Sequence, residues 1–260
     1  MLTSVHNYPK WYQNYHFYVQ LSFFIVSLGS LSWHYWFLVF NEALINPEYS
    51  SDVLAWDFFG YWSMQSTVIV LFYSLLNIIY YLKPNIALQW VTNFHIRNFT
   101  NIFLVIAMIS YYVAIIIGPP PINDLTKKFA YRNYWIPTHI QHFCLPILML
   151  VYSLFAPSSY ISLSKYLKKN LYLYYLYPMF YGFFVLLRGH IKIITEQGNN
   201  DYDWTRYYPY FFFNVQQTSP NGWLVFFIAY IIFFLVFLIL GSIFIYINNL
   251  LVLRRQDYPQ

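Results

Sequence analysis

Charged side chains are scarce in this chain. Of its 260 residues, 9% are Asp, Glu, Lys or Arg, whereas 59% are hydrophobic. Soluble domains carry about 25% charged residues, so the composition excludes an ordinary soluble protein and predicts an integral membrane protein. The net charge of +5 is not gathered into a basic helix or a clustered Lys/Arg face. We therefore expect membrane lipids, and no nucleic acid, as partners.

Cysteine is almost absent as well. Cys144 is the single cysteine and lies in an apolar stretch, which excludes an intramolecular disulfide. The segment before the first long apolar stretch is polar and aromatic, without the short apolar core and small-residue cleavage site of a signal peptide. We expect the first apolar segment to stay in the protein as an anchor. No cofactor is predicted.

Long apolar runs, in contrast, are abundant. Six can be delimited, at about 17–40, 54–82, 101–117, 137–156, 171–187 and 223–250. Crossing a bilayer takes roughly 20 residues of helix, and continuous rather than alternating apolar runs predict helices instead of barrel strands. The connectors hold turn sequences such as Gly118-Pro119-Pro120-Pro121, which a helix cannot continue through. The sequence predicts an all-α, polytopic membrane protein: one domain over 1–260, folded as a six-helix transmembrane bundle.

Lys and Arg are divided unequally between the two sides of such a bundle. Eight lie in the amino-terminal segment, the second and fourth connectors and the tail, and six lie in the other three connectors. The positive-inside rule then predicts that both termini are cytoplasmic. The wealth of Phe, Tyr, Ile and Asn is typical of an AT-rich genome, and we expect a bacterial plasma membrane.

Reactive polar side chains lie within two of the apolar segments. In the second segment, helical spacing places five of them on one stripe: Ser63, Ser66, Thr67, Ser74 and Asn77. In the fourth, a shared face holds Thr138, His142, Pro146 and Ser153, with His139 one turn earlier. The predicted topology puts Ser63 and His142 in the outer half of the membrane. A hydroxyl and an imidazole at similar depth are what nucleophilic catalysis needs, because the imidazole takes the proton of the attacking hydroxyl.

Two other interpretations of these residues stay open. Ser and Thr in membrane helices most often bond a backbone carbonyl or pack against another helix, which would make the stripe structural. A metal site could use His139 and His142, one turn apart, with His34 and His190 towards the same side. No carboxylate or cysteine lies at matching spacing, so no metal site is predicted.

The last third of the chain holds a second polar and aromatic cluster. Arg188 lies at the outer end of the fifth segment, and an aromatic run follows over 204–215. A functional interpretation has Arg188 binding a carboxylate or phosphate while the aromatic run covers an acyl pocket. The structural alternative is a snorkelling arginine beside an interfacial aromatic belt. Pro178, inside the fifth segment, should kink its helix.

These motifs together resemble a known family. The residues that carry the resemblance are Tyr61-Trp62-Ser63-Met64-Gln65-Ser66-Thr67, His142 with Pro146, Tyr177-Pro178, Leu187-Arg188-Gly189 and Tyr208-Pro209-Tyr210-Phe211-Phe212-Phe213-Asn214-Val215. They are similar in order and spacing to the Pr6Pr family of bacterial six-span membrane proteins, related to the androgen-induced membrane hydrolases of fatty acid esters of hydroxy fatty acids. The resemblance runs from about Asp57 to Leu250.

The resemblance implies roles for individual residues. A threonine nucleophile and a histidine in the hydrolases correspond to Ser63 and His142, so serine stands where threonine is usual. Thr67 occupies a position that is often asparagine in the bacterial members. The residues expected to bind substrate are Arg188, Tyr208, Asn214, His139, Gln65 and Thr67.

The sequence thus leads to a hypothesis with open alternatives. The hypothesis is an intramembrane lipid or acyl-ester hydrolase that uses Ser63 and His142. The alternatives are a non-catalytic protein that binds lipid or transports a small solute, and a subunit of a larger membrane complex. No internal repeat stands out, and many transporter folds contain one, which counts against transport.

Overall fold

A computed structural model of the protein describes residues 14–41, 58–84, 86–117, 135–156, 159–195, 207–215 and 221–257. All regular structure within these ranges is helical, and none of it is strand. The chain divides into two compact units. Unit 1 comprises Met1–Asn41 and Ser63–Ser153, and unit 2 comprises Glu42–Trp62 and Leu154–Gln260. The predicted all-α class is confirmed for the described residues, while a single domain over 1–260 stays a prediction.

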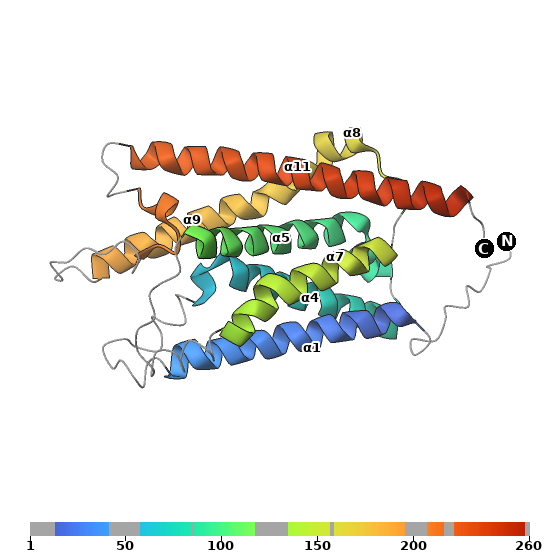
Figure 1. Ribbon diagram of the computed structural model, residues 1–260, viewed down its shortest axis with the longest axis horizontal. Helices are drawn as coiled ribbons and strands as arrows, with labels where there is room; N and C mark the ends of the chain where they lie inside the picture. The colour runs from blue at the N-terminus through green and yellow to red at the C-terminus, as the bar shows by residue number, and fades with distance from the viewer. Residues whose placement is uncertain are drawn as a thin grey trace. The chain divides into compact units, whose positions relative to one another are not determined.

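Unit 1 is built mainly from four helices (Figure 1). They are α1 (Tyr15–Tyr35), α4 (Trp62–Leu82), α5 (Phe94–Ile117) and α7 (Leu145–Phe155). Three short elements adjoin them: the π-helices η2 (Trp36–Asn41) and η4 (Ile140–Cys144), and the 3-10 helix η3 (Ile86–Thr92). Both α1 and α5 contact η4, so the residues of η4 are packed against two different helices.

The π-helix η4 has an identifiable local cause. Pro146 has no backbone N–H and cannot donate the usual helical hydrogen bond to the carbonyl of His142, four residues earlier. The helical turn at this point contains one extra residue, because the N–H of Leu145 bonds to the carbonyl of Ile140, five residues earlier. Such π-turns occur often at functional sites, because they reorient the side chains of one turn. The sequence predicted the helix here, but not this change of register.

Unit 2 centres on two long helices, α9 (Leu171–Thr195) and α11 (Gly222–Asp257), which contact each other. The shorter elements are α8 (Leu163–Lys165), η5 (Tyr166–Asn170) and the 3-10 helix η6 (Phe211–Phe213). Glycines allow tyrosines to approach the helices. A Cβ at Gly182 would overlap the hydroxyl of Tyr230, and one at Gly241 would overlap that of Tyr166. As predicted, Pro178 lies inside a helix, α9.

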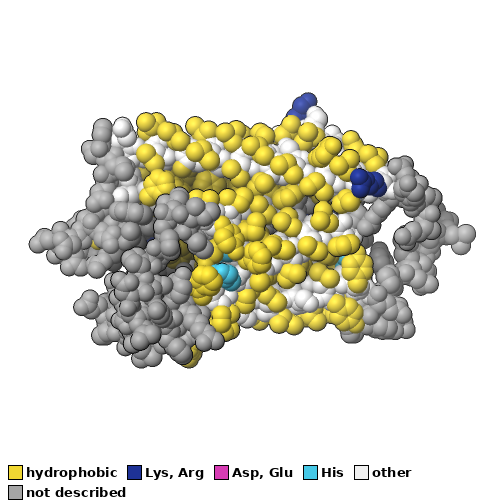
Figure 2. Space-filling view, viewed as in Figure 1, with side chains coloured by type: hydrophobic (Ala, Val, Ile, Leu, Met, Phe, Trp, Pro, Cys, Tyr) yellow, Lys and Arg dark blue, Asp and Glu magenta, His cyan; other side chains and the backbone are white. Residues whose placement is uncertain are grey.

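Four stretches of helix are long and apolar enough to cross a membrane. They are Trp62–Leu82, Phe94–Val113, Trp135–Phe155 and Gly222–Arg254. The last has a mean hydropathy of 3.1, and 11% of that window is buried, so most of its apolar surface faces outward. On the face seen in Figure 2, hydrophobic side chains cover most of the described surface. Several apolar helices with exposed apolar side chains are compatible with an integral membrane protein.

The remaining predicted segments are helical as well, in α1 and α9. α1 carries several Tyr, His and Ser side chains, and α9 carries several Tyr together with Arg188, His190 and Lys192, all of which lower the mean hydropathy. A count of six membrane spans therefore stays a prediction. One boundary differs from expectation: α4 begins at Trp62, so Ser63 lies in its first turn rather than deep in the helix. The start of that predicted segment, 54–57, lies outside the described residues.

Candidate functional site

His142 is buried in η4, with 7% of its surface exposed. Its Nδ1 lies 2.8 Å from the carbonyl oxygen of Thr138, and its ring stacks on Tyr111 with centroids 4.2 Å apart. A carbonyl oxygen only accepts hydrogen bonds, so Nδ1 carries the proton in the neutral ring and donates it to Thr138. Nε2 is then left with a lone pair. This is the tautomer that a general base requires.

Ser63 is also buried, with 6% exposed, and is the second residue of α4. Its carbonyl accepts hydrogen bonds from the hydroxyls of Ser66 (2.8 Å) and Thr67 (2.9 Å). Among the described residues, none donates to or accepts from the Ser63 hydroxyl itself. Ser63 therefore differs from its neighbours on the stripe, whose hydroxyls are bonded within the helix.

The predicted stripe on α4 is confirmed as a buried face. All five members are at most 6% exposed: Ser63, Ser66, Thr67, Ser74 and Asn77. Ser74 bonds the carbonyl of Val70 at 2.6 Å, and Asn77 bonds that of Tyr73 at 2.8 Å. These bonds to the helix's own backbone satisfy the polar groups without a ligand, as the structural interpretation expects for most of the stripe.

Ser63 and His142 both belong to unit 1, but no hydrogen bond joins them. Nδ1 of His142 is engaged with Thr138, and its Nε2 is the atom that would have to meet Ser63 Oγ. Catalytic hydrogen bonds are often long or misaligned before substrate binds. The lack of a hydrogen bond between Ser63 and His142 therefore neither confirms nor contradicts the predicted pair.

The other histidines near η4 have different partners. His139 is half-buried, with Nδ1 3.1 Å from the Trp135 carbonyl and its ring stacked on Trp135 at 3.8 Å. His34 of α1 is buried, with Nδ1 3.2 Å from Oε1 of Gln141, and this bond ties α1 to η4. Across the described part of the chain, no three His, Cys, Asp or Glu side chains gather where they could hold a metal.

Arg188 lies in unit 2, near the end of α9, and is 8% exposed. Its Nη1 donates to the carbonyl of Tyr207 at 3.4 Å, and a Cβ on Gly60 would lie 2.9 Å from that nitrogen. The guanidinium therefore packs on the backbone at Gly60. This burial is unlike the snorkelling arginine of the structural alternative, whose charged end would reach water.

The residues that lead into α4 are anchored within unit 2. Tyr181 of α9 donates its hydroxyl hydrogen to the carbonyl of Gly60 at 2.8 Å. The backbone N–H of Trp62 lies 3.3 Å from the hydroxyl of Tyr210. Tyr181 of α9 and Tyr210 of the aromatic run thus hold the backbone immediately before Ser63, a role that the sequence did not predict for them.

The remaining predicted substrate-binding residues have varied surroundings. Tyr208 is 2% exposed, and its ring occupies the space that a Cβ on Gly189 would need. Asn214 is 4% exposed, Gln65 is half-buried, and Thr67 is fully buried and bonded to Ser63. Tyr208 and Asn214 lie in unit 2 with Arg188, and Gln65 and Thr67 lie in unit 1 with Ser63.

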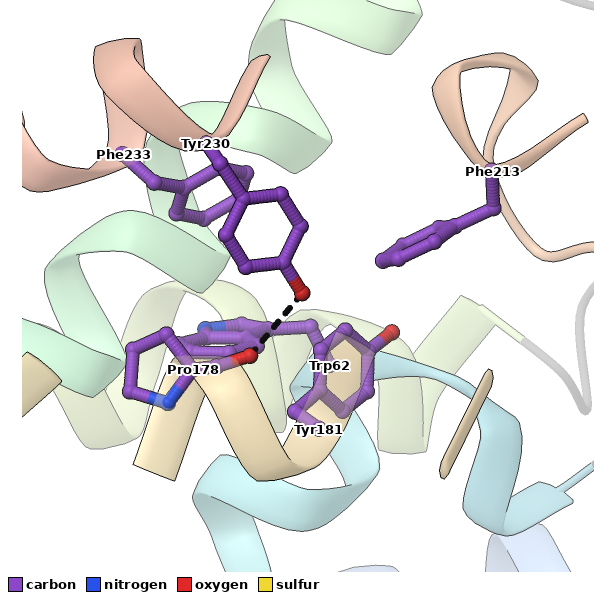
Figure 3. Close-up of a pocket in the computed structure, with 6 residues that line it drawn as sticks. All are labelled: Trp62, Pro178, Tyr181, Phe213, Tyr230 and Phe233. Carbon is purple, nitrogen blue, oxygen red and sulfur yellow. Dashed lines mark hydrogen bonds between the residues drawn. The ribbon is translucent and has the colours of Figure 1, made fainter. Parts of the chain in front are cut away.

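Unit 2 contains a small aromatic pocket, drawn in Figure 3, that sequence reasoning missed. It encloses about 200 Å³, open space at its mouth included, and is lined by Trp62, Pro178, Tyr181, Phe213, Tyr230 and Phe233. The hydroxyl of Tyr230 crosses from α11 and donates to the Pro178 carbonyl at 3.0 Å. Gly182, one turn after Pro178, was the only sequence signal for so close an approach of another helix.

Comparison with known proteins gives no further guide to this site. No family model, no curated protein and no solved structure matches the chain.

Proposed function

We propose that this chain is an integral membrane hydrolase of lipid or acyl esters, in which Ser63 is the nucleophile and His142 the general base. The observation that carries the proposal is the hydrogen bond from His142 Nδ1 to the Thr138 carbonyl. It fixes the tautomer that leaves Nε2 basic, inside an apolar helix where an imidazole is costly and therefore rarely present without a function.

The reaction follows from these two groups. Ser63 Oγ attacks the ester carbonyl carbon while its proton passes to Nε2 of His142. The tetrahedral intermediate collapses, the bond to the alkoxide leaving group breaks, and His142 returns the proton to that oxygen. Water, deprotonated by His142 in turn, then attacks the acyl-serine. The carboxylic acid is released and the Ser63 hydroxyl regains its proton.

Two features of Ser63 support its role as the nucleophile. Among the described residues, none hydrogen-bonds to its hydroxyl, so breaking an existing bond is not part of the cost of attack. It also lies in the first turn of α4. The positive end of the helix macrodipole favours negative charge there, including an oxyanion that forms beside Ser63.

A fluorophosphonate probe tests the assignment. The detergent-purified protein is labelled as wild type, Ser63→Ala, His142→Ala and Ser74→Ala. Ser74 is the matched control, because it is a buried serine of the same helix whose hydroxyl is bonded to the Val70 carbonyl. Thermal stability is measured for all four proteins, so that loss of labelling is separated from loss of fold.

We expect labelling of the wild type and of Ser74→Ala, and loss of labelling in Ser63→Ala and His142→Ala with stability retained. Labelling that survives Ser63→Ala contradicts the assignment of the nucleophile. An unlabelled wild type that nevertheless binds lipid esters favours the non-catalytic alternative of lipid binding or solute transport. Co-purification of a stoichiometric protein favours the alternative of a subunit.

The finer features of the proposal are six membrane spans, cytoplasmic termini, a bacterial plasma membrane and kinship with the Pr6Pr family. They rest on the six apolar segments, on the distribution of Lys and Arg and on the motifs given above. Labelling single cysteines in the connectors of a Cys144→Ala background with an impermeant maleimide would test the topology. The proposal requires the first, third and fifth connectors to react from the outer side.

A further inference from the structure

Arg97 is buried near the start of α5, with 6% of its surface exposed. Within the described residues, its Nε and Nη2 atoms have no hydrogen-bond partner. Its Cζ lies 5.8 Å from the ring centroid of Phe94 and 5.9 Å from that of Tyr152. Aromatic faces attract a cation, but they offer no oxygen to the N–H groups. A buried guanidinium needs such acceptors to offset its loss of hydration.

The described residues of unit 1 include no carboxylate that could pair with Arg97. The only acidic residue in the sequence of unit 1 is Asp124, which lies outside the described residues. The described part of unit 1 therefore supplies no counter-ion for Arg97.

Other polar groups lie near this arginine. Gln20 is 0% exposed, and its amide interacts with the hydroxyls of Tyr73 and Tyr152, the second of which also borders Arg97. These groups are already engaged with one another, so Nε and Nη2 of Arg97 remain the donors without a partner among the described residues.

We propose that unit 1 binds an oxyanion, the phosphate or carboxylate of an amphiphilic lipid, at Arg97. A lipid source suits the position, because Arg97 is the fourth residue of a helix stretch that is apolar enough to span a membrane. Headgroups lie at the ends of such spans, and the amino-terminal end of a helix favours an anion. Tyr73 lies ten residues after Ser63, about 15 Å along α4, so this site is separate from the proposed catalytic pair.

The test compares Arg97→Gln with wild type and with Arg254→Gln. Arg254 is an exposed arginine of α11, and its variant changes net charge by the same amount. The full-length protein in a non-ionic detergent is titrated separately with phosphatidylglycerol, oleate, phosphatidylcholine and inorganic phosphate. Native mass spectrometry measures binding, and the shift of Tm measures stabilisation.

We expect phosphatidylglycerol or oleate to bind wild type and Arg254→Gln, phosphatidylcholine to bind more weakly, and Arg97→Gln to lose about tenfold or more in affinity. A response to inorganic phosphate equal to that of the lipid would show that the site takes a free ion and would overturn the lipid source. Equal lipid binding by Arg97→Gln, or no anion binding by wild type, would overturn the site.

Stability without lipid provides a second readout. Removing an uncompensated buried charge should leave the Tm of Arg97→Gln equal to or above that of wild type. A much lower Tm in the absence of lipid would show that Arg97 is satisfied within the protein, which contradicts the proposal.

Discussion

Gly241 of α11 makes room for the side chain of Tyr166, and its substitution gives a quantitative test of the packing in unit 2. Tyr166 is 0% exposed and donates its hydroxyl hydrogen to the Phe237 carbonyl at 3.1 Å. A Cβ at position 241 would overlap that hydroxyl and lie 2.5 Å from Cζ of the same ring. Tyr166 is fully enclosed, so it cannot swing into open space. In Gly241→Ala the ring must therefore shift and its hydrogen bond must weaken.

The magnitude follows from three terms. Overpacking a core typically costs about 1–3 kcal/mol. Loss of one buried hydrogen bond adds about 1 kcal/mol, and the higher helix propensity of alanine returns about 1 kcal/mol. Gly241→Ala should therefore lower the free energy of unfolding by about 1–3 kcal/mol. For a chain of this size each kcal/mol corresponds to roughly 2–4 °C in Tm.

Gly29→Ala is the matched control. Gly29 is an exposed glycine within α1, and a Cβ there would meet no atom within 4 Å. This variant should gain about 0.5–1 kcal/mol, because only the propensity term remains.

Thermal unfolding of the purified proteins in one detergent, followed by tryptophan fluorescence, measures both variants. If Gly241→Ala is as stable as wild type or more stable, Tyr166 does not occupy this space and the reasoning is refuted. The double variant Gly241→Ala/Tyr166→Leu adds a coupling test. Relief of the overlap should make its loss of stability smaller than the sum of the two single losses.

Two further predictions concern other parts of the fold. Asn249 mimics a backbone partner, since its Nδ2 donates to the Ile161 carbonyl at 2.8 Å and its Oδ1 accepts from the Ile161 N–H at 2.9 Å. Asn249→Ala should cost about 1–3 kcal/mol in thermal unfolding, whereas exposed Thr195→Ala should stay within about 0.5 kcal/mol, and equal effects would contradict this role. Pro146→Ala restores a backbone N–H, so the variant should have the same Tm as wild type or a higher one. Because the change should reorient His142, we expect weaker fluorophosphonate labelling. Unchanged labelling would contradict a role of the π-helix η4 in placing His142.

Several features of the protein could be predicted from local sequence alone. The helical segments and the buried stripe on α4 follow from the length of apolar runs and from a spacing of 3.6 residues per turn, which neighbouring residues determine by themselves. The burial of His142 was predictable for the same reason, because it lies on the polar face of an otherwise apolar helix. These predictions required no knowledge of which helix packs against which.

Pairwise details of the site were beyond such reasoning. The sequence contained Pro146, but it did not predict the π-helix η4 beside it or the contacts that α1 and α5 make with η4. In the same way, Gly182 indicated that another helix could approach α9 closely at this residue. Only the packing of the helices showed that the side chain of Tyr230 fills the space beside it.

The sequence by itself determined the all-α class, the apolar helices and the candidate pair Ser63 and His142, because composition and periodicity are properties of the chain. Tertiary structure decided which polar groups are satisfied. Ser66 and Thr67 bond to the backbone of Ser63, whereas Nε and Nη2 of the buried Arg97 have no acceptor among the described residues. Burial and hydrogen bonding depend on the distances between residues far apart in the chain, and those distances exist only once the helices have packed.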